Sequence, residues 1–378
     1  MMIVIPGSLF QLLALVGVFY TLAALVVAGR RTATASNLPA DRASVTLLKP
    51  LYGSEPHLSA NLRTFLDQDY PAPIEMICGV QRTDDPAVET VRALRADDPR
   101  VKLCIDGRRH GSNGKVANLV NMAPHIGNDL VVLSDSDMAV EPDYLARIAA
   151  VLAAPGVGAV TCLYAGRGDA GFWSRLAAAG ISYQFLPSVM IGLALGLARP
   201  CMGSTIAMRR ETLYRIGGFA PFADVLADDH AIGEAVRALG LAVVVPPMIV
   251  THGCTETSLG AVARHELRWN ATVRGLDPIG FVGSMVTYPI PLALLGLLSP
   301  TPIAAFILIA ACTARVALML RIDRLTGRKS APSWVLPLRD ICSLILFVGS
   351  FFIRSVDWRG ERLRMEQDGR VSAKSEFD

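Results

Sequence analysis

Long uncharged segments near both ends of the chain constrain its fold more than any other feature. The first 29 residues carry no charged side chain, and residues 3–28 are long enough to cross a bilayer as a helix. Charged side chains are concentrated between about residues 30 and 274, and further apolar runs follow at 279–298, 301–320 and 344–353. The sequence therefore predicts a membrane-embedded part on either side of a water-soluble middle.

Composition supports this division and excludes some functions. Apolar residues make up 52% of the 378 residues and charged residues 18%, and the mean hydropathy of +0.41 is too high for a purely soluble protein. A formal net charge of +3 without a lysine-rich arm argues against nucleic-acid binding. The seven cysteines are scattered and include no C-x-x-C pair, so we expect reduced packing residues rather than disulfides or a zinc site.

The first apolar segment is predicted to be a retained anchor. A cleaved signal peptide, the alternative, would carry its positive charges before the apolar run, whereas here Arg30 and Arg31 follow it. The positive-inside rule then places the N-terminus outside and the chain after Arg30 in the cytoplasm. For a bacterial protein this predicts a multi-pass protein of the inner membrane.

The middle of the chain alternates short apolar runs with helical spacing. We expect strands at 45–50, 74–80, 101–105 and 130–133, and helices around 61–66, 87–96 and 115–123. This alternation predicts an α/β domain with a mostly parallel sheet and helices on both faces. Ligands of such sheets bind beyond the carboxyl ends of the strands.

Three apolar segments are ambiguous. Residues 176–198 are long enough to span, but Gln184, Pro187 and several glycines interrupt them, so we expect a helix and loop at the bilayer surface or under an acceptor site. Residues 279–298 and 301–320 predict a transmembrane hairpin whose basic loop, 321–329, returns to the cytoplasm. The run at 344–353 fits a third span or a re-entrant hairpin equally well, because both its flanks are basic, the second through Arg354, Arg359, Arg362 and Arg364.

Two acidic motifs follow predicted strands. Asp135 and Asp137 form a D-x-D directly after the fourth strand, where a divalent cation could bridge them to a nucleotide diphosphate. Asp84 and Asp85 follow the second strand and could accept a hydrogen bond from a nucleoside. An aspartate after a strand is also common in turns and helix caps, which is the competing interpretation for both motifs.

A third acidic pair, Asp228 and Asp229, precedes a predicted helix. Capping of that helix is again the simpler explanation, but inverting glycosyl transfer needs a general base, and one carboxylate of the pair could serve. Lys115, near the start of another helix, could reach a phosphate or a uridine.

A helical face further along carries three more candidates. His265, Arg268 and Trp269 are spaced to share that face, where a cation could hold a departing diphosphate and an aromatic ring could contact an acceptor. An amphipathic surface helix on anionic lipid is the alternative.

Several runs of residues together resemble the ceramide glucosyltransferases. They are K-P-L-Y-G at 49–53, L-D-Q-D-Y-P at 66–71, Q-R-T-D-D-P-A at 81–87, S-D-S at 134–136, the aspartates at 228–229 and R-W at 268–269. The resemblance covers about residues 45–274 and implies a GT-A fold with a D…D…D…(Q/R)xxRW signature. His265 departs from the Gln or Arg usual at the first position of its last motif.

Within that family, residues 200–219, 226–230 and 264–269 look most like a bacterial branch associated with hopanoid biosynthesis. The resemblance implies transfer of N-acetylglucosamine from UDP to a hydroxylated hopanoid, with a divalent cation (Mg or Mn) held by Asp135 and Asp137. It further implies that Asp84 or Asp85 contacts uridine, that Asp229 is the base, and that Arg268 and Trp269 serve acceptor and leaving group.

These inferences divide the chain into five regions. They are an anchor at 1–34, a cytoplasmic GT-A domain at 35–250, an interfacial helix at 251–277, a transmembrane hairpin at 278–325, and a third membrane segment or re-entrant hairpin with a basic tail at 326–378. The predicted partners are a UDP-sugar, a lipid acceptor and the bilayer. Glucosyl transfer to ceramide, a processive polysaccharide synthase and a non-catalytic scaffold are the alternatives.

Overall fold

The computed structural model describes residues 7–30, 42–353, 355–358, 361–365 and 371–373. Arg31, Arg354 and Arg359 lie outside the described residues, and Arg362 and Arg364 are described by their backbone alone. The chain forms two compact units, an α/β unit (Ala33–Tyr164, Arg199–Thr255 and Leu363–Asp378) and a helical unit (Met1–Thr32, Ala165–Ala198 and Glu256–Arg362).

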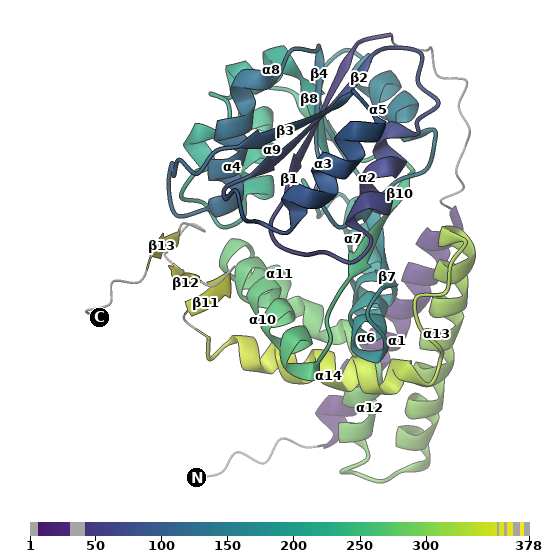
Figure 1. Cartoon of the computed structure of the whole chain (residues 1–378). Coiled ribbons are helices and arrows are strands. Elements are labelled where there is room, and N and C mark those ends of the chain that lie inside the picture. The colour runs from purple at the N-terminus through teal and green to yellow at the C-terminus, as the bar shows by residue number, and fades with distance from the viewer. Residues whose placement is uncertain (1–6, 31–41, 354, 359–360, 366–370, 374–378) are drawn as a thin grey trace. The chain divides into compact units, whose positions relative to one another are not determined.

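A seven-stranded sheet forms the centre of the α/β unit (Figure 1). Its order is β3-β2-β1-β4-β8-β6-β9, and every pairing is parallel except the two made by β8. All six residues of β1 are buried, as expected for a strand covered on both faces. The strands are β1 (Val45–Pro50), β2 (Ile74–Val80), β3 (Val101–Ile105), β4 (Leu130–Leu133), β6 (Val157–Thr161), β8 (Ile206–Arg209) and β9 (Ala242–Val244).

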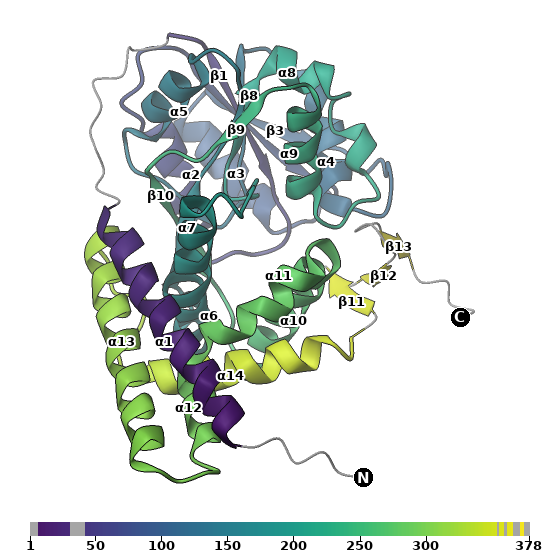
Figure 2. The ribbon, with the colours of Figure 1, turned by 180° about the vertical axis from the view of Figure 1, so that it is seen from behind.

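Helices cover both faces of this sheet, which confirms the predicted α/β architecture. Helices α4 and α9 lie on one face, and α2, α3 and α5 lie on the other (Figures 1 and 2). The edge-on contact of Phe65 with Tyr144 joins α2 to α5. The helices of this unit are α2 (Leu58–Leu66), α3 (Ala87–Asp97), α4 (Gly114–Met122), α5 (Tyr144–Leu152), α8 (Arg210–Arg215) and α9 (Asp228–Ala238).

Two further strands connect the end of β4 to a distant part of the chain. Strand β5 (Met138–Ala139) pairs antiparallel with β10 (Ile249–Cys254), and His252 lies opposite Met138. The D-x-D is therefore held between the central sheet and this small ladder. Strand β7 (Leu163–Gly168) leads from the α/β unit into the helical one. Near the end of the chain β11 (Ser355–Trp358) is followed by β12 (Glu361–Met365), whose backbone pairs antiparallel with β13 (Val371–Ala373).

The helical unit contains three helices that are long and apolar enough to cross a membrane, among the residues described. They are α1 (Gly7–Arg30), the continuous rod of α6 (Phe172–Gly180), a π-helical turn (Ile181–Phe185) and α7 (Leu186–Ala194), and α13 (Pro302–Thr326). Helices α1 and α13 lie beside α12 (Pro289–Gly296), where Ala14, Ile290 and Ala311 are buried together. The sequence predicts residues 176–198 as part of the α/β domain; the structure places them in the helical unit.

The predicted first leg of the hairpin is bent. Helix α11 (Pro278–Gly283) and the 3-10 turn Ser284–Thr287 meet α12 at an angle of 68°. Pro289 and Pro291 at the start of α12 lack backbone N–H groups, and a residue before proline avoids the helical conformation, so the break falls at Tyr288. Helix α10 (Leu259–Leu276) packs against α14 (Val335–Ser350), which at 16 residues is shorter than the candidate spans.

Candidate active site

The D-x-D lies where the parallel strands end. Asp135 is the second residue after β4, and its backbone N–H donates to the carbonyl of Gly203 at 3.2 Å. A side chain at position 203 would meet the Asp135 carboxylate, since an added Cβ would lie 2.7 Å from Oδ2. The glycine thus allows the loop before β8 to lie against the turn that carries Asp135 and Asp137, here named the acidic turn.

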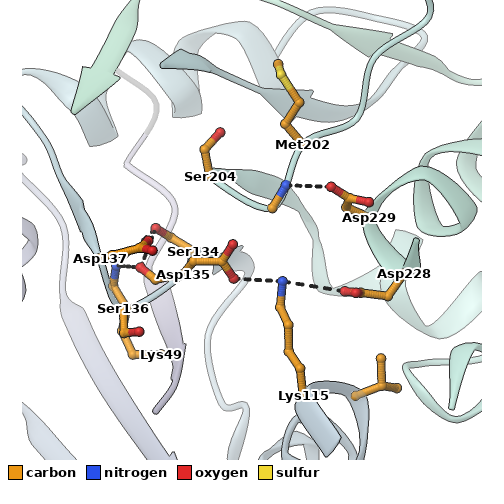
Figure 3. A network of polar contacts seen from close by, with 12 residues as sticks. Lys49, Lys115, Ser134, Asp135, Ser136, Asp137, Met202, Ser204, Asp228 and Asp229 are labelled. Atoms are coloured by element: carbon orange, nitrogen blue, oxygen red, sulfur yellow. Dashed lines mark hydrogen bonds and ion pairs between the residues drawn. The ribbon is translucent and has the colours of Figure 1, made fainter. Parts of the chain in front are cut away.

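Lys115 joins two of the predicted acidic motifs (Figure 3). Its Nζ lies 2.7 Å from Oδ1 of Asp135 and 3.5 Å from Oδ2 of Asp228. The side-chain amide of Asn113, the N-cap residue of α4, donates to the other oxygen of Asp228 at 3.4 Å. A buried ammonium group therefore neutralises carboxylates from two different elements.

The acidic pair at the start of α9 has two different environments. Asp228 is buried, whereas Asp229 is partly exposed and accepts hydrogen bonds from the backbone of Gly203 at 3.0 Å and of His230 at 2.7 Å. The bond to His230 satisfies one N–H in the first turn of α9, but the N-cap residue of this helix is Ala227, and no side chain caps it. The position of Asp229 beside Gly203 brings it close to the D-x-D as well.

The electrostatics of this cluster follow from burial. Burial raises the pKa of Asp228 to about 6, although Lys115 opposes the change. Burial also raises the pKa of Asp229. For Lys115 burial alone would lower the pKa, but Asp135, Asp228 and Asp229 together raise it, so the ammonium stays charged. A carboxylate whose pKa is raised toward neutrality is suited to accept a proton.

Lys49 stabilises the D-x-D through hydrogen bonds to the turn that carries it. It is fully buried at the end of β1, and its Nζ donates to Ser134 Oγ at 3.0 Å and to the Asp135 carbonyl at 3.1 Å. The Phe65 ring lies 3.2 Å from the same nitrogen. Burial lowers the pKa of Lys49 to about 7, with Asp135 opposing that effect. This lysine was not among the predicted site residues.

Asp84 and Asp85 follow β2, as predicted, but their contacts are those of a turn. Asp84 is exposed and pairs with Arg82. Both carboxylate oxygens of Asp85 accept from the backbone of Gly53, and Oδ1 also accepts from Ala87 at the start of α3. Asp85 thereby fixes the loop after β1, which leaves the predicted nucleoside contact as a hypothesis.

The candidates on α10 belong to the helical unit. His265 Nδ1 lies 2.6 Å from Glu256 Oε1, and the His265 ring meets that of Trp269 edge-on at 4.6 Å. Arg268 is partly buried on the same helix. Between His265 and Arg268, Glu266 pairs with the buried Arg339 of α14, so α10 is fixed to its neighbour.

The acidic turn has the chemistry of a hard-cation site. Oδ1 of Asp137 is buried and has no hydrogen-bond partner in the described part of the chain, and Asp135 lies two residues away. No group of three or more His, Cys, Asp or Glu side chains that could hold a metal occurs among the described residues. Magnesium and manganese sites complete their coordination with water and substrate phosphates, so two carboxylates are enough. The residues therefore fit the predicted cation.

Sequence reasoning missed Lys49, Asn113 and His252 as members of this region. A lysine inside the otherwise apolar strand at 45–50 was a usable signal, because a buried charge needs partners. An asparagine three residues before a helical valine is a recognisable cap. His252 carries no local signal, since strand pairing alone brings it to the D-x-D.

Comparison with known proteins identifies the family. The model for glycosyl transferase family 21 matches residues 9–371. The chain belongs to this family. Its α/β unit, with the mostly parallel sheet, has the GT-A-like fold that the resemblance implied.

Two curated relatives are ceramide glucosyltransferases. Ceramide glucosyltransferase 1 of Caenorhabditis elegans is 25% identical over 199 residues, which are 52% of this chain and 42% of that protein. The ceramide glucosyltransferase of Komagataella phaffii is 29% identical over 160 residues, 38% of this chain and 31% of that protein. The matches thus cover less than half the length of either relative.

Two solved structures are also similar. One is the mannosyltransferase PcManGT from Pyrobaculum calidifontis with GDP-Man and Mn2+, at 21% identity, 91% coverage of this chain, 99% of that chain and a TM-score of 0.49. The other is Staphylococcus aureus TarS with UDP-GlcNAc, at 13% identity, coverage of 88% and 99%, and a TM-score of 0.38. The family assignment rests on the sequence match.

Proposed function

We propose that this protein is an inverting glycosyltransferase that moves a sugar from a UDP-sugar to the hydroxyl of a membrane lipid. The observation that carries the proposal is the cluster at the end of β4, where Lys115 links Asp135 to Asp228 and the partly exposed Asp229 lies beside Gly203. Membership of family 21 supports the reaction class.

In this proposal Asp229 is the general base. It takes the proton of the acceptor hydroxyl as the hydroxyl oxygen attacks the anomeric carbon, and the bond from that carbon to the diphosphate breaks. UDP leaves with the bonding electron pair, and the configuration at the anomeric carbon inverts. Asp228 and Lys115 hold the start of α9 and the acidic turn at a fixed distance.

The donor would be held at the acidic turn. Asp135 and Asp137 would bind the divalent cation, directly or through water, and a cation there supplies positive charge that stabilises the leaving diphosphate. Lys49 and Lys115 keep the turn in place. Roles for Asp84 or Asp85 at the nucleoside, and for His265, Arg268 and Trp269 at acceptor and leaving group, rest on the family resemblance.

Two acceptors compete within this reaction class. The runs at 200–219 and 264–269 favour a hydroxylated hopanoid with N-acetylglucosamine as the sugar. The names of the two curated relatives favour ceramide with glucose. Purified protein given UDP-N-acetylglucosamine or UDP-glucose with each lipid would decide between them. Mass spectrometry of the product would also reveal a polymer, which would replace both proposals by a polysaccharide synthase.

Asp229→Asn tests the base directly. We expect kcat to fall by about 100-fold or more, because general-base catalysis contributes about that much, while UDP-sugar binding is retained. Asp97→Asn is the control, since Asp97 lies exposed on α3 and pairs only with Arg63 among the described contacts. Undiminished turnover by Asp229→Asn would overturn the assignment of the base.

A further inference from the structure

The start of helix α4 is fastened to the segment that precedes helix α9. Asn113, the N-cap residue of α4, is fully buried, and its backbone N–H donates to the carbonyl of Ala223 at 2.8 Å. Its side-chain amide donates to the carbonyl of Val225 at 2.7 Å and to Asp228 Oδ1 at 3.4 Å. Bonds from one residue thus reach three positions in the run that leads into α9.

A second pair of bonds joins the same two segments closer to the surface. The backbone N–H and the hydroxyl of Ser112 donate to Asp224 Oδ1 at 2.8 Å and 3.0 Å. The backbones also approach closely, since a Cβ added to Gly111 would lie 2.6 Å from the carbonyl oxygen of Ala223. The link between α4 and α9 therefore has a partly exposed end at Ser112 and a buried end at Asn113.

Helix α9 has no side-chain cap of its own. Its N-cap residue is Ala227, whose methyl group cannot accept a hydrogen bond from the first turn. The position of Asp228 is set instead from α4, by the amide of Asn113 and by Lys115, which lies two residues further on (Figure 3). The acidic pair and its counter-charge therefore depend on one short segment at the start of α4.

The side chain of Asn113 has two separable functions. Its oxygen accepts from the backbone N–H of Val116 at 3.0 Å, which caps α4, while its NH2 group supplies the hydrogens for Val225 and Asp228. Aspartate caps a helix as well as asparagine does, but an ionised carboxylate has no hydrogen to donate. A cap alone would tolerate either residue at this position, whereas the bonds to the run before α9 require the amide.

We propose that Asn113 is a positioning residue for the transfer reaction, which fixes the start of α9 against Lys115 so that Asp229 keeps its place beside Gly203. This inference rests on the proposed function, because Asp229 is the base in that reaction. Since Asn113 is fully buried, it acts through these contacts rather than on the substrate. A reacting group displaced by about 1 Å can lose about 100-fold in rate, so the contacts matter to catalysis.

Asn113→Asp separates the two functions of the side chain. The variant keeps the cap of α4 but sets an anionic oxygen against the Val225 carbonyl and Asp228, so the run into α9 should move away. The assay uses the full chain in detergent at about pH 8.5, chosen to keep the introduced carboxyl group ionised. We expect kcat to fall about 10- to 100-fold, while the dissociation constant for the UDP-sugar changes less than about threefold. Unchanged kcat would show that Asn113 is a cap only and would overturn the inference.

Hydrogen exchange measured by mass spectrometry tests the same link without reference to activity. In Asn113→Asp the backbone of residues 223–231 should exchange faster, while residues 116–122 of α4 keep their protection. Equal exchange at 223–231 in the variant and the unaltered protein would contradict the proposed link.

Asp224 supplies a milder pair of variants at the exposed end of the link. Asp224→Ala removes the acceptor of both Ser112 bonds and should lower kcat about threefold, whereas Asp224→Asn keeps an accepting oxygen and should restore it. Thr301→Ala, which removes the side-chain cap of α13, is the control for loss of a cap and should leave kcat unchanged.

The outcomes separate this inference from the proposed function. Should Asn113→Asp fail to fold, unchanged kcat in Asp224→Ala would overturn the inference. Absence of transfer by the unaltered protein would overturn the proposed function and this role with it, whereas full activity of Asn113→Asp would remove the role of Asn113 alone.

Discussion

At the scale of single residues, Lys115 is the charge on which the candidate site depends. Its side chain is 10% exposed and that of Asp228 is 7% exposed, so both charges are largely removed from water. Lys115→Met would leave these carboxylates without a counter-charge, and breaking a buried pair costs about 3–5 kcal/mol. Because Asp135 is 37% exposed, we expect the low end, about 3 kcal/mol, in the free energy of unfolding.

Lys102→Met is the matched control. Lys102 pairs with Glu75, but its side chain is 56% exposed, so losing that pair should cost about 1 kcal/mol or less. Denaturant unfolding of both variants in detergent measures the difference. Equal losses would show that Lys115 does not compensate buried charge.

The acidic pair on α9 predicts opposite pH effects on activity and stability. Burial raises the pKa of Asp228 to about 6 and also raises the pKa of Asp229. Because these two carboxylates are adjacent, their titrations are linked, and both lie above the ordinary aspartate pKa near 3.8. The base, Asp229, works only when ionised, so kcat/KM should fall as pH drops through its raised pKa, at a higher pH than for an ordinary aspartate.

The stability effect has the reverse sign. Between the unfolded and the raised folded pKa values the folded state binds more protons, so the free energy of unfolding decreases as pH rises through about 4 to 6. Asp228→Asn should remove much of that decrease. A rate profile flat down to pH 4 would contradict the raised pKa values. Unfolding measurements across the same pH range would test the predicted decrease in the free energy of unfolding.

At the scale of elements, helix α1 depends on a close approach to the turn before α12. A Cβ added to Gly17 would lie 2.4 Å from the backbone carbonyl oxygen of Val286, which cannot move as a side chain can. Gly17→Ala should therefore separate the two elements and lower the midpoint of thermal unfolding by several degrees, equivalent to about 1–3 kcal/mol.

Gly29→Ala is the control on the same helix. The nearest atoms to a Cβ there are 3.9 Å away and belong to the flexible Arg321 side chain, so we expect no loss and a small gain from helix propensity. Thermal unfolding of both variants in one detergent compares them. A Gly17→Ala protein as stable as the unaltered chain would mean that this contact is dispensable.

The elements also show how far the sequence predicts the molecule. The strands at 45–50, 74–80, 101–105 and 130–133 were predictable, because each is a short, mostly apolar run bounded by polar or turn-forming residues. The bend at Tyr288 was not, since apolar composition gives length and no direction. Residues 176–198 were predicted to be an interrupted helix and loop of the α/β domain, whereas the structure places them in the helical unit.

The candidate site was predictable in the same uneven way. Asp135, Asp228 and Asp229 stand out because carboxylates beside strand and helix ends are conspicuous, and the structure brings their elements together through Lys115. His252 could not be predicted, because it reaches Asp137 only through pairing across more than a hundred residues. Roles that depend on long-range pairing leave no local pattern.

At the scale of the whole molecule, the charges of the helical unit predict its orientation in a membrane. Arg321 of α13 donates to the carbonyl of Gly29 at 2.9 Å, so the basic ends of α1 and α13 lie together. At the other end Gln11 donates to the carbonyls of Gly296 and Ser299, and residues 297–301 carry no charge. By the positive-inside rule we predict that the basic end faces the cytoplasm.

Two single cysteines test this orientation in cells. Leu298→Cys lies at the uncharged end and is 70% exposed, whereas Ser333→Cys follows the basic segment and is also exposed. Cys312 and Cys342, the two native cysteines that are not buried, are replaced first. We expect an impermeant maleimide to label position 298 in intact spheroplasts and position 333 only after lysis. The reverse pattern would place the basic end outside the cell, where UDP-sugars are not supplied, and would contradict a cytoplasmic transfer reaction.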